Sequence, residues 1–233
     1  MIHRYAVAAL FVSCLSGCGS EPKAEPAETP PASQPSETAP ADSRPLVVFL
    51  GTSLTAGQGL RDPSFAYPAL VQERLDSAGL KFRVVNAGIS GETSAGALRR
   101  IDWVMGQGTV AVLFLETGAN DGLRGQDPDT LRANIDAILQ RAQRQVPPPR
   151  LIVAGMEAPP NLGTQYTERF RGVFPAAATA HGAALVPFLL QGVAGVPELN
   201  QADGIHPTPE GHRRIAELVW ATVLEALRAV ERN

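Results

Sequence analysis

Five short runs of apolar residues recur along this chain, and stretches with helical spacing separate them. The runs lie at residues 46–50, 82–85, 110–115, 151–154 and 184–186. Short apolar runs are typical of strands that are buried on both faces of a parallel sheet. Because these runs alternate with helical stretches, they predict an α/β domain with a mostly parallel sheet.

The stretches between the runs carry the period and the end signals of helices. The clearest has Asp127 as its cap and Pro128 in its first turn, and the prolines at 147–149 end it. Another, around 165–180, contains Pro175 and is expected to be kinked. Two of the predicted helices show a long apolar face, made of Leu131, Ile135, Ile138, Leu139, Ala142 and Val146 in one and of Ile215, Leu218, Val219, Thr222, Ala226, Leu227 and Val230 in the last.

The first residues resemble an export signal rather than part of a fold. The apolar stretch at residues 5–15 is shorter than the ~20 residues that span a bilayer. Leu15-Ser16-Gly17-Cys18 resembles the lipobox of bacterial lipoproteins, which implies cleavage before Cys18 and lipidation of its sulfur. A plain signal peptide with an incidental cysteine is the alternative. We therefore expect a signal peptide at 1–17 and a membrane-anchored lipoprotein on the periplasmic or extracellular face of the cell envelope.

Residues 18–45 are expected to be a disordered tether between this anchor and a domain at 46–233. From residue 19 to 45 the chain has seven prolines, five acidic and two basic residues, and no aromatic residue. Such a segment cannot bury enough apolar surface to offset its ordering entropy. Both cysteines of the chain precede it, so the core alone must hold the domain together. A formal net charge of −3 and the lack of a basic patch with aromatic residues argue against nucleic-acid binding.

Polar or glycine-rich segments follow the first three predicted strands. Ser53 follows the first strand, Gly88 the second and Asn120 the third. The C-terminal ends of parallel strands meet at one edge of the sheet, where open α/β sheets carry their sites. The sequence therefore predicts one site that contains all three residues.

One of the four histidines is placed to activate Ser53 as a nucleophile. His206 follows Asp203 by three residues, with a glycine between, so the carboxylate can bind one ring nitrogen and leave the other as a base. A tight turn is the alternative when this motif is considered alone. The candidate catalytic residues are Ser53, His206 and Asp203. The other histidines are expected in the leader, at a solvated helix end and on the polar side of the last helix (His3, His181 and His212).

The tetrahedral intermediate of acyl transfer needs hydrogen-bond donors aimed at its oxygen. The candidates are the backbone N–H groups of Ser53 and Gly88 and the side-chain amide of Asn120. A turn at Gly88 and a loop cap at Asn120 are the alternatives when each residue is considered alone. Asp203 with His206 is the largest group of candidate ligands, so no metal site is predicted.

These segments resemble the four sequence blocks of the SGNH (GDSL) hydrolases. The blocks are G-T-S-L at 51–54, Gly88, G-A-N-D at 118–121 and D-G-I-H-P at 203–207. The segments at 86–94, 120–125 and 186–189 are similar to the bacterial branch of thioesterase I, arylesterase and lysophospholipase. The resemblance implies a flavodoxin-like three-layer α/β/α sandwich with about five parallel strands, a Ser53–His206–Asp203 triad, an oxyanion hole of Ser53, Gly88 and Asn120, no metal or organic cofactor, and a monomer.

The resemblance also implies hydrolysis of small acyl or aryl carboxylic esters, of acyl thioesters and, in some members, of lysophospholipids. Two residues depart from the family pattern: Thr52 replaces the usual Asp and so removes a charge, and Ala119 replaces a common glycine and narrows the space beside Asn120. The predicted acyl pocket, whose members could each be ordinary packing residues, consists of Leu123, Met156, Leu162, Tyr166, Phe170 and Ile205, with Arg124 at its entrance. Two other functions stay open: a deacetylase of acetylated envelope glycans, and a tethered binding lipoprotein without turnover.

Overall fold

The computed structural model describes residues 42–232. The signal peptide, the lipidation of Cys18 and most of the tether lie outside these residues and stay predictions. Arg44, which we assigned to the tether, donates a hydrogen bond to the carbonyl oxygen of Phe82 at 3.3 Å, so contacts with the domain begin before residue 46. Within residues 42–232, no helix is long and apolar enough to cross a membrane.

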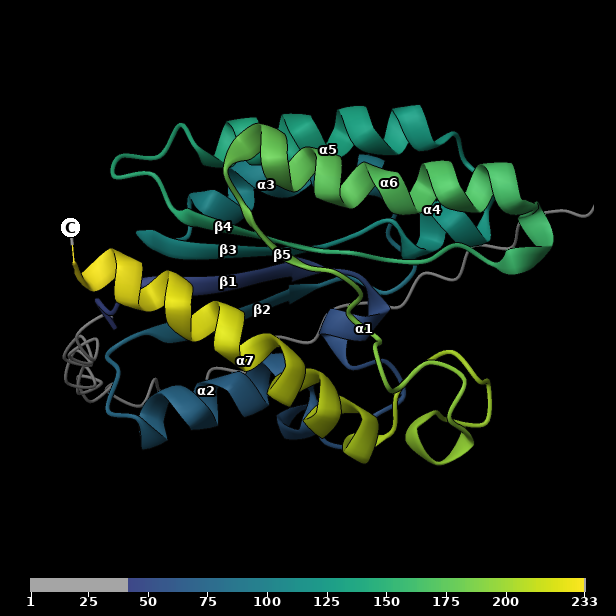
Figure 1. Cartoon of the computed structure of the whole chain (residues 1–233). Helices are drawn as coiled ribbons and strands as arrows, with labels where there is room; N and C mark the ends of the chain where they lie inside the picture. Colours follow the sequence, from purple (N-terminus) through teal and green to yellow (C-terminus); the bar gives the residue numbers. More distant parts are fainter. Residues whose placement is uncertain (1–41, 233) are drawn as a thin grey trace, which may run out of the picture. The chain divides into compact units, whose positions relative to one another are not determined.

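The domain is built on one sheet of five parallel strands, as the apolar runs predict (Figure 1). The strands are β1 (Leu46–Gly51), β2 (Arg83–Gly88), β3 (Val110–Glu116), β4 (Arg150–Ala154) and β5 (Ala184–Val186). Their order, β2-β1-β3-β4-β5, is the flavodoxin-like order, which changes direction between β1 and β3. Sheets of this kind bind ligands at the C-terminal strand ends beside that point, which is where Ser53 follows β1.

Helices cover both faces of the sheet, which confirms the three-layer α/β/α arrangement (Figure 1). On one face α2 (Tyr67–Ser77) packs against α7 (Pro209–Glu231). The other face is covered by α3 (Ser94–Met105), α5 (Pro128–Ala142) and α6 (Thr164–His181). The connections contain the short helices α1 (Ser53–Ala56) and α4 (Ala119–Leu123) and the 3₁₀ turns η1 (Pro63–Phe65), η2 (Pro160–Leu162) and η3 (Pro197–Leu199).

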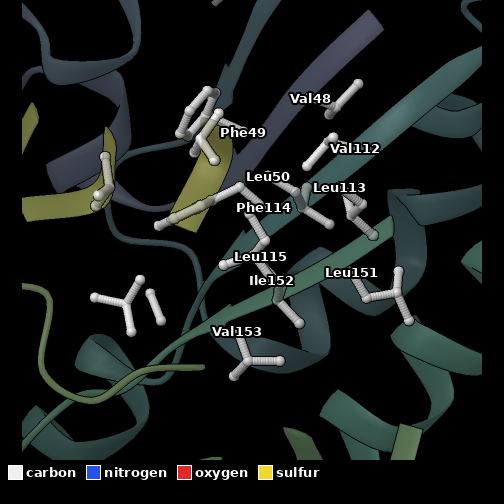
Figure 2. Packing of buried hydrophobic residues seen from close by; sticks show 14 of the residues in the cluster. Val48, Phe49, Leu50, Val112, Leu113, Phe114, Leu115, Leu151, Ile152 and Val153 are labelled. Atoms are coloured by element: carbon white, nitrogen blue, oxygen red, sulfur yellow. The ribbon is translucent and has the colours of Figure 1, made fainter. Parts of the chain in front are cut away.

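The two central strands form the middle of the core. Every residue of β1 and β3 is buried, and Figure 2 shows their side chains packed together. The rings of Phe49 and Phe114 lie 4.9 Å apart between centroids, and Tyr67 of α2 meets Phe49 edge-on at 5.5 Å. Removing one such side chain from water contributes ~1.5–3 kcal/mol. This packing fixes the strand ends that carry the candidate site.

The structure confirms the best-marked helix and corrects the extent of its apolar face. The Asp127 carboxylate accepts the N–H of Asp129 at 3.2 Å, and the predicted face of α5 is buried as far as Ala142. Val146, predicted on the same face, is 91 % exposed because the helix has already ended. α6 continues through Pro175 as one uninterrupted helix.

His212 lies on the buried face of α7, whereas we predicted it on the polar side of this helix. It belongs to a stripe of buried residues at helical spacing that includes Ile215, Val219 and Val223. Its ring stacks on Tyr67 at 6.2 Å between centroids, and its Nδ1 accepts the N–H of Tyr67 at 3.2 Å. Burial, together with the nearby His206, lowers the pKa of His212 to about 4.

Because His212 is buried, we expect the protein to lose stability in mild acid. In the unfolded chain its pKa returns to about 6.5, so the unfolded state binds a proton that the folded state binds only near pH 4. The free energy of unfolding should therefore fall by up to about 3 kcal/mol as the pH drops from about 6.5 to about 4. His212→Gln does not titrate and can still accept the N–H of Tyr67, so urea unfolding should show a flatter pH profile. An equal slope in both proteins would contradict this assignment.

Candidate active site

Ser53 lies at a sharp turn between β1 and α1. Gly51 has no room for a side chain, because a Cβ there would overlap Thr55 and Glu116. The chain then turns at Thr52, and Ser53 becomes the first residue of α1. None of the described residues accepts a hydrogen bond from the N–H of Ser53, as expected at a helix start. The turn thus presents both a hydroxyl and a backbone donor at the end of β1.

The structure brings Ser53, His206 and Asp203 together as predicted. His206 Nε2 lies 3.0 Å from Ser53 Oγ, and His206 Nδ1 lies 2.6 Å from Asp203 Oδ2. Asp203 Oδ1 accepts the N–H groups of Ile205 at 2.9 Å and His206 at 3.0 Å, in a tight loop where Gly204 has a φ of +69°. The bond from His206, followed by the two backbone bonds, holds the pKa of Asp203 well below its usual value. The ionised carboxylate therefore keeps a proton on Nδ1 and leaves Nε2 free to accept one.

Ser53 and His206 line a cavity of about 770 Å³. Three residues of the predicted pocket also line it: Met156 is buried, and Leu123 and Ile205 are half-exposed. Much of the remaining wall is apolar and comes from the segments after β4 and β5, which supply Ala158, Pro159, Pro160, Phe188, Leu190 and Ala194. Sequence periodicity could not identify these residues because loops have no repeating face.

Four other predicted residues do not line the cavity, namely Arg124, Leu162, Tyr166 and Phe170. Phe170 is fully buried in the core beneath α4, so its apolar character reflects packing. Tyr166 donates its hydroxyl to the carbonyl oxygen of Gln126 at 2.7 Å. Arg124 is exposed and donates to the carbonyl oxygen of Gly91 at 3.0 Å, and Leu162 is half-buried in η2. The predictions of Tyr166 and Phe170 were wrong because the inner face of α6 packs on the core rather than on the cavity.

The structure also corrects the assignment of Gly88. β2 extends as far as Gly88, which pairs with Gly51, and the N–H of Gly88 donates to Asn86 Oδ1 at 3.0 Å. A Cβ at this position would overlap the backbone of Ala56, so the glycine serves the packing of α1 against β2. Gly91, by contrast, lines the cavity, and its N–H has no hydrogen-bond partner within residues 42–232. The free donor after β2 is therefore at Gly91.

Asn120 lies on the cavity wall, as predicted, and so does Ala119 beside it. The side-chain Nδ2 of Asn120 donates to the carbonyl oxygen of Glu92 at 3.0 Å, which leaves its second N–H for a ligand. The adjacent Asp121 is buried and accepts the N–H and the hydroxyl of Ser94 at 2.9 and 2.5 Å. Asp121 thereby ties α4 to the start of α3 and keeps Asn120 in place.

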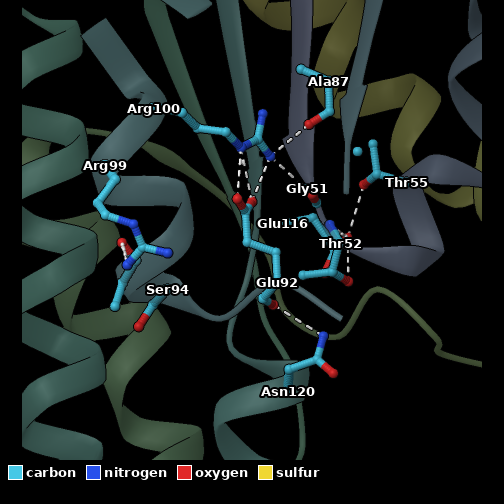
Figure 3. A network of polar contacts seen from close by, with 12 residues as sticks. Gly51, Thr52, Thr55, Ala87, Glu92, Ser94, Arg99, Arg100, Glu116 and Asn120 are labelled. Atoms are coloured by element: carbon cyan, nitrogen blue, oxygen red, sulfur yellow. Dashed lines mark hydrogen bonds and ion pairs between the residues drawn. The ribbon is translucent and has the colours of Figure 1, made fainter. Parts of the chain in front are cut away.

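A buried carboxylate lies directly beneath the nucleophile turn (Figure 3). Glu116, the last residue of β3, accepts the N–H of Thr52 at 2.7 Å and the hydroxyls of Thr52 and Thr55, each at 2.9 Å. Burial raises the pKa of Glu116, and these bonds oppose the shift. An Asp at position 52 would set a second carboxylate beside this one, whereas the Thr52 hydroxyl donates a hydrogen bond to it. Glu116 therefore places a buried carboxyl group beneath a turn whose own residue 52 is uncharged.

The arrangement offers nucleophilic chemistry. A hydroxyl, a base oriented by a carboxylate and several free N–H donors meet at the wall of a largely apolar cavity. Residues 42–232 contain no group of three or more His, Cys, Asp or Glu side chains that could hold a metal ion.

Known proteins are similar to this chain in sequence and in fold. Residues 49–214 match the family model described as GDSL-like Lipase/Acylhydrolase family. The chain is 42% identical over 177 residues to Esterase TesA of Pseudomonas aeruginosa, and the match covers 76% of this chain and 87% of that protein. It is 35% identical over 171 residues to Thioesterase 1/protease 1/lysophospholipase L1 of Escherichia coli K12, and the match covers 73% of this chain and 79% of that protein. The crystal structure of the psychrotrophic esterase EstA from Pseudoalteromonas sp., inhibited by monoethylphosphonate, matches with a TM-score of 0.73 at 30% identity, covering 78% of this chain and 98% of that one.

Proposed function

We propose that this chain, which belongs to the GDSL-like lipase/acylhydrolase family of ester hydrolases, cleaves carboxylic esters and thioesters of apolar acyl or aryl groups. Ser53 is the nucleophile of the proposed reaction. The observation that carries the proposal is the pair of contacts made by His206, 3.0 Å to Ser53 Oγ and 2.6 Å to Asp203 Oδ2. A nucleophile within hydrogen-bond reach of a base, which a third group orients, is the arrangement that activates a serine.

The reaction then follows from the positions of the three side chains. Ser53 Oγ attacks the carbonyl carbon while its proton passes to His206 Nε2, and Asp203 stabilises the resulting imidazolium. When the tetrahedral intermediate collapses, His206 gives this proton to the departing alcohol or thiol, which leaves an acyl group on Ser53. Water repeats the attack with His206 as its base, and the acid leaves as Ser53 regains its proton.

We propose that the oxyanion hole consists of the N–H groups of Ser53 and Gly91 and the free N–H of the Asn120 amide. The first two have no partner among the described residues, and all three residues line the cavity that Ser53 shares with His206. Each well-placed donor of this kind commonly contributes ~10²–10³ to the rate. Gly91 replaces Gly88 in this role, because the N–H of Gly88 is already bonded to Asn86.

The cavity favours an acyl or aryl substrate over a glycan. Its volume of about 770 Å³ falls in the usual range for small-molecule sites, and most of the side chains that line it are apolar. A single acyl chain, as in the lysophospholipids that the name of the Escherichia coli relative indicates, fits such a wall better than sugar hydroxyls, which need polar partners. The oriented His206 and the free donors also argue against a binding protein without turnover.

A chain-length profile tests the proposal. With p-nitrophenyl esters from acetate to palmitate, we expect kcat/KM of the full chain in detergent to peak beyond acetate, because added methylenes enter the apolar cavity. Each buried methylene contributes ~0.8 kcal/mol, or roughly fourfold, until the cavity is full. Ser53→Ala serves as the blank, and Ser77→Ala, at an exposed serine of α2, is the matched control.

Three results would count against it. Equal rates in wild type and Ser53→Ala would remove Ser53 as the nucleophile. A rate confined to acetate would favour the glycan deacetylase. Failure of a fluorophosphonate to label Ser53 would exclude an activated serine.

A further inference from the structure

Arg100 contacts the backbone of two strand ends that border the active site (Figure 3). It lies on α3, and its Nη2 donates to the carbonyl oxygens of Gly51 at 3.2 Å and Ala87 at 2.8 Å. Gly51 is the last residue of β1 and precedes Ser53 by two positions, while Ala87 lies near the end of β2. One guanidinium group therefore ties the C-terminal ends of β1 and β2 together.

Glu92 holds this guanidinium in a single orientation. Its carboxylate accepts Arg100 Nε at 2.8 and 2.9 Å and Nη2 at 2.6 Å. The two side chains are only 15% and 10% exposed, so solvent competes little for these bonds. Gly96 makes room for the pair, because a Cβ at that position would overlap the side chain of Glu92. A planar fork bound at two points is held in direction as well as in position.

The backbone of Glu92 in turn bears on two of the proposed oxyanion donors. Its carbonyl oxygen accepts Asn120 Nδ2 at 3.0 Å and so sets the direction of the second N–H on that amide. Its N–H donates to the carbonyl oxygen of Ile89 at 3.2 Å, which closes the turn that contains Gly91. Any shift of Glu92 would therefore turn the Asn120 amide and move the N–H of Gly91.

We infer that Arg100 is a positioning residue of the oxyanion hole, acting through Glu92 and Gly51. The inference rests on the proposed function, since it concerns donors that act only in that reaction. The three donors follow three different strands: Ser53 follows β1, Gly91 follows β2 and Asn120 follows β3. Arg100 contacts the backbone of the first two strands directly and reaches the third through Glu92. A misplacement of about 1 Å at a catalytic group can cost ~10²-fold in rate.

The shape of the arginine side chain is essential to this role. Nε and Nη2 both bind the carboxylate, and the two hydrogens of Nη2 are shared among this carboxylate and the two carbonyl oxygens. A lysine has the same charge but only one nitrogen and no fork, so it cannot hold Glu92 and both strand ends at once. Arg100→Lys should therefore keep the positive charge but no longer hold Glu92 and the two strand ends in place.

Kinetics of the full chain can test the inference with Arg100→Gln, Arg100→Lys and Glu92→Gln. Arg99→Gln, on the exposed side of the same helix, is the matched control and should behave as wild type. We expect kcat per fluorophosphonate-titrated site to fall by ~10–10²-fold in Arg100→Gln, with KM within about twofold, because the acyl cavity is untouched. A boronic acid that adds to Ser53 and mimics the tetrahedral intermediate should lose affinity by a similar factor.

These readouts separate positioning from a role in folding alone. A folding role would lower the number of titrated sites and leave kcat per site and boronic acid affinity unchanged. Unchanged values per site in Arg100→Gln and Glu92→Gln would overturn the inference, and Arg100→Lys supplies the same comparison if Arg100→Gln does not fold. A wild type no faster than Ser53→Ala would instead overturn the proposed function and this inference with it.

Discussion

Asp203→Asn is expected to lower kcat/KM by about 10⁴-fold without unfolding the protein. Asp203 Oδ1 accepts two backbone N–H groups, so an asparagine would keep its amide oxygen there and turn its NH₂ toward His206 Nδ1. That NH₂ donates a hydrogen bond, which forces the imidazole proton onto Nε2. Nε2 then faces Ser53 with a proton already in place and cannot remove another.

Steady-state kinetics together with thermal unfolding check this prediction. The midpoint of unfolding should change little, because both backbone bonds to Oδ1 persist. Asp102→Asn, whose side chain is 69% exposed on α3, is the matched control and should retain wild-type kinetics. A kcat/KM within tenfold of wild type in Asp203→Asn would show that Asp203 does not set the tautomer of His206.

Asn120→Ala is expected to lower kcat by ~10²–10³-fold and to change KM little. One N–H of its amide is engaged by the carbonyl oxygen of Glu92, so only the other is available to the oxyanion. The ester carbonyl of the bound substrate carries much less charge than the oxygen of the intermediate, and the loss therefore falls on the transition state. Asn120→Asp has nearly the same shape but no donor, and its negative charge should make it at least as slow.

The division between kcat and KM decides the role of Asn120. A loss confined to KM would make this residue a contact for the bound substrate rather than for the intermediate. An unchanged kcat in Asn120→Ala would remove it from the oxyanion hole and leave the N–H groups of Ser53 and Gly91 as the donors.

Much of the site could be predicted because its residues lie in short segments at strand ends. Ser53, Asn120 and the Asp203–His206 pair each follow a local pattern, and parallel strands bring such segments to one edge of the sheet. Apolar runs and helix periodicity likewise predict the layers, since burial of a strand or of a helix face leaves a regular trace in the sequence. The β2 region shows the limit, because Gly88 and Gly91 are both plausible until the end of the strand is known.

What the sequence by itself determined is the α/β class, the order of the elements and the choice of Ser53, His206 and Asp203 as the residues proposed for nucleophile, base and acid. Only the tertiary structure decided that Gly91 carries the free donor, that His212 is buried, and that Phe170 belongs to the core. It alone also showed that Glu116 lies beneath the nucleophile turn and that Arg100 grips Glu92. These facts depend on where a side chain points and on which N–H is already bonded. Contacts between segments far apart in the sequence decide the direction of a side chain and the partner of an N–H group. Such contacts leave no periodic pattern in the sequence.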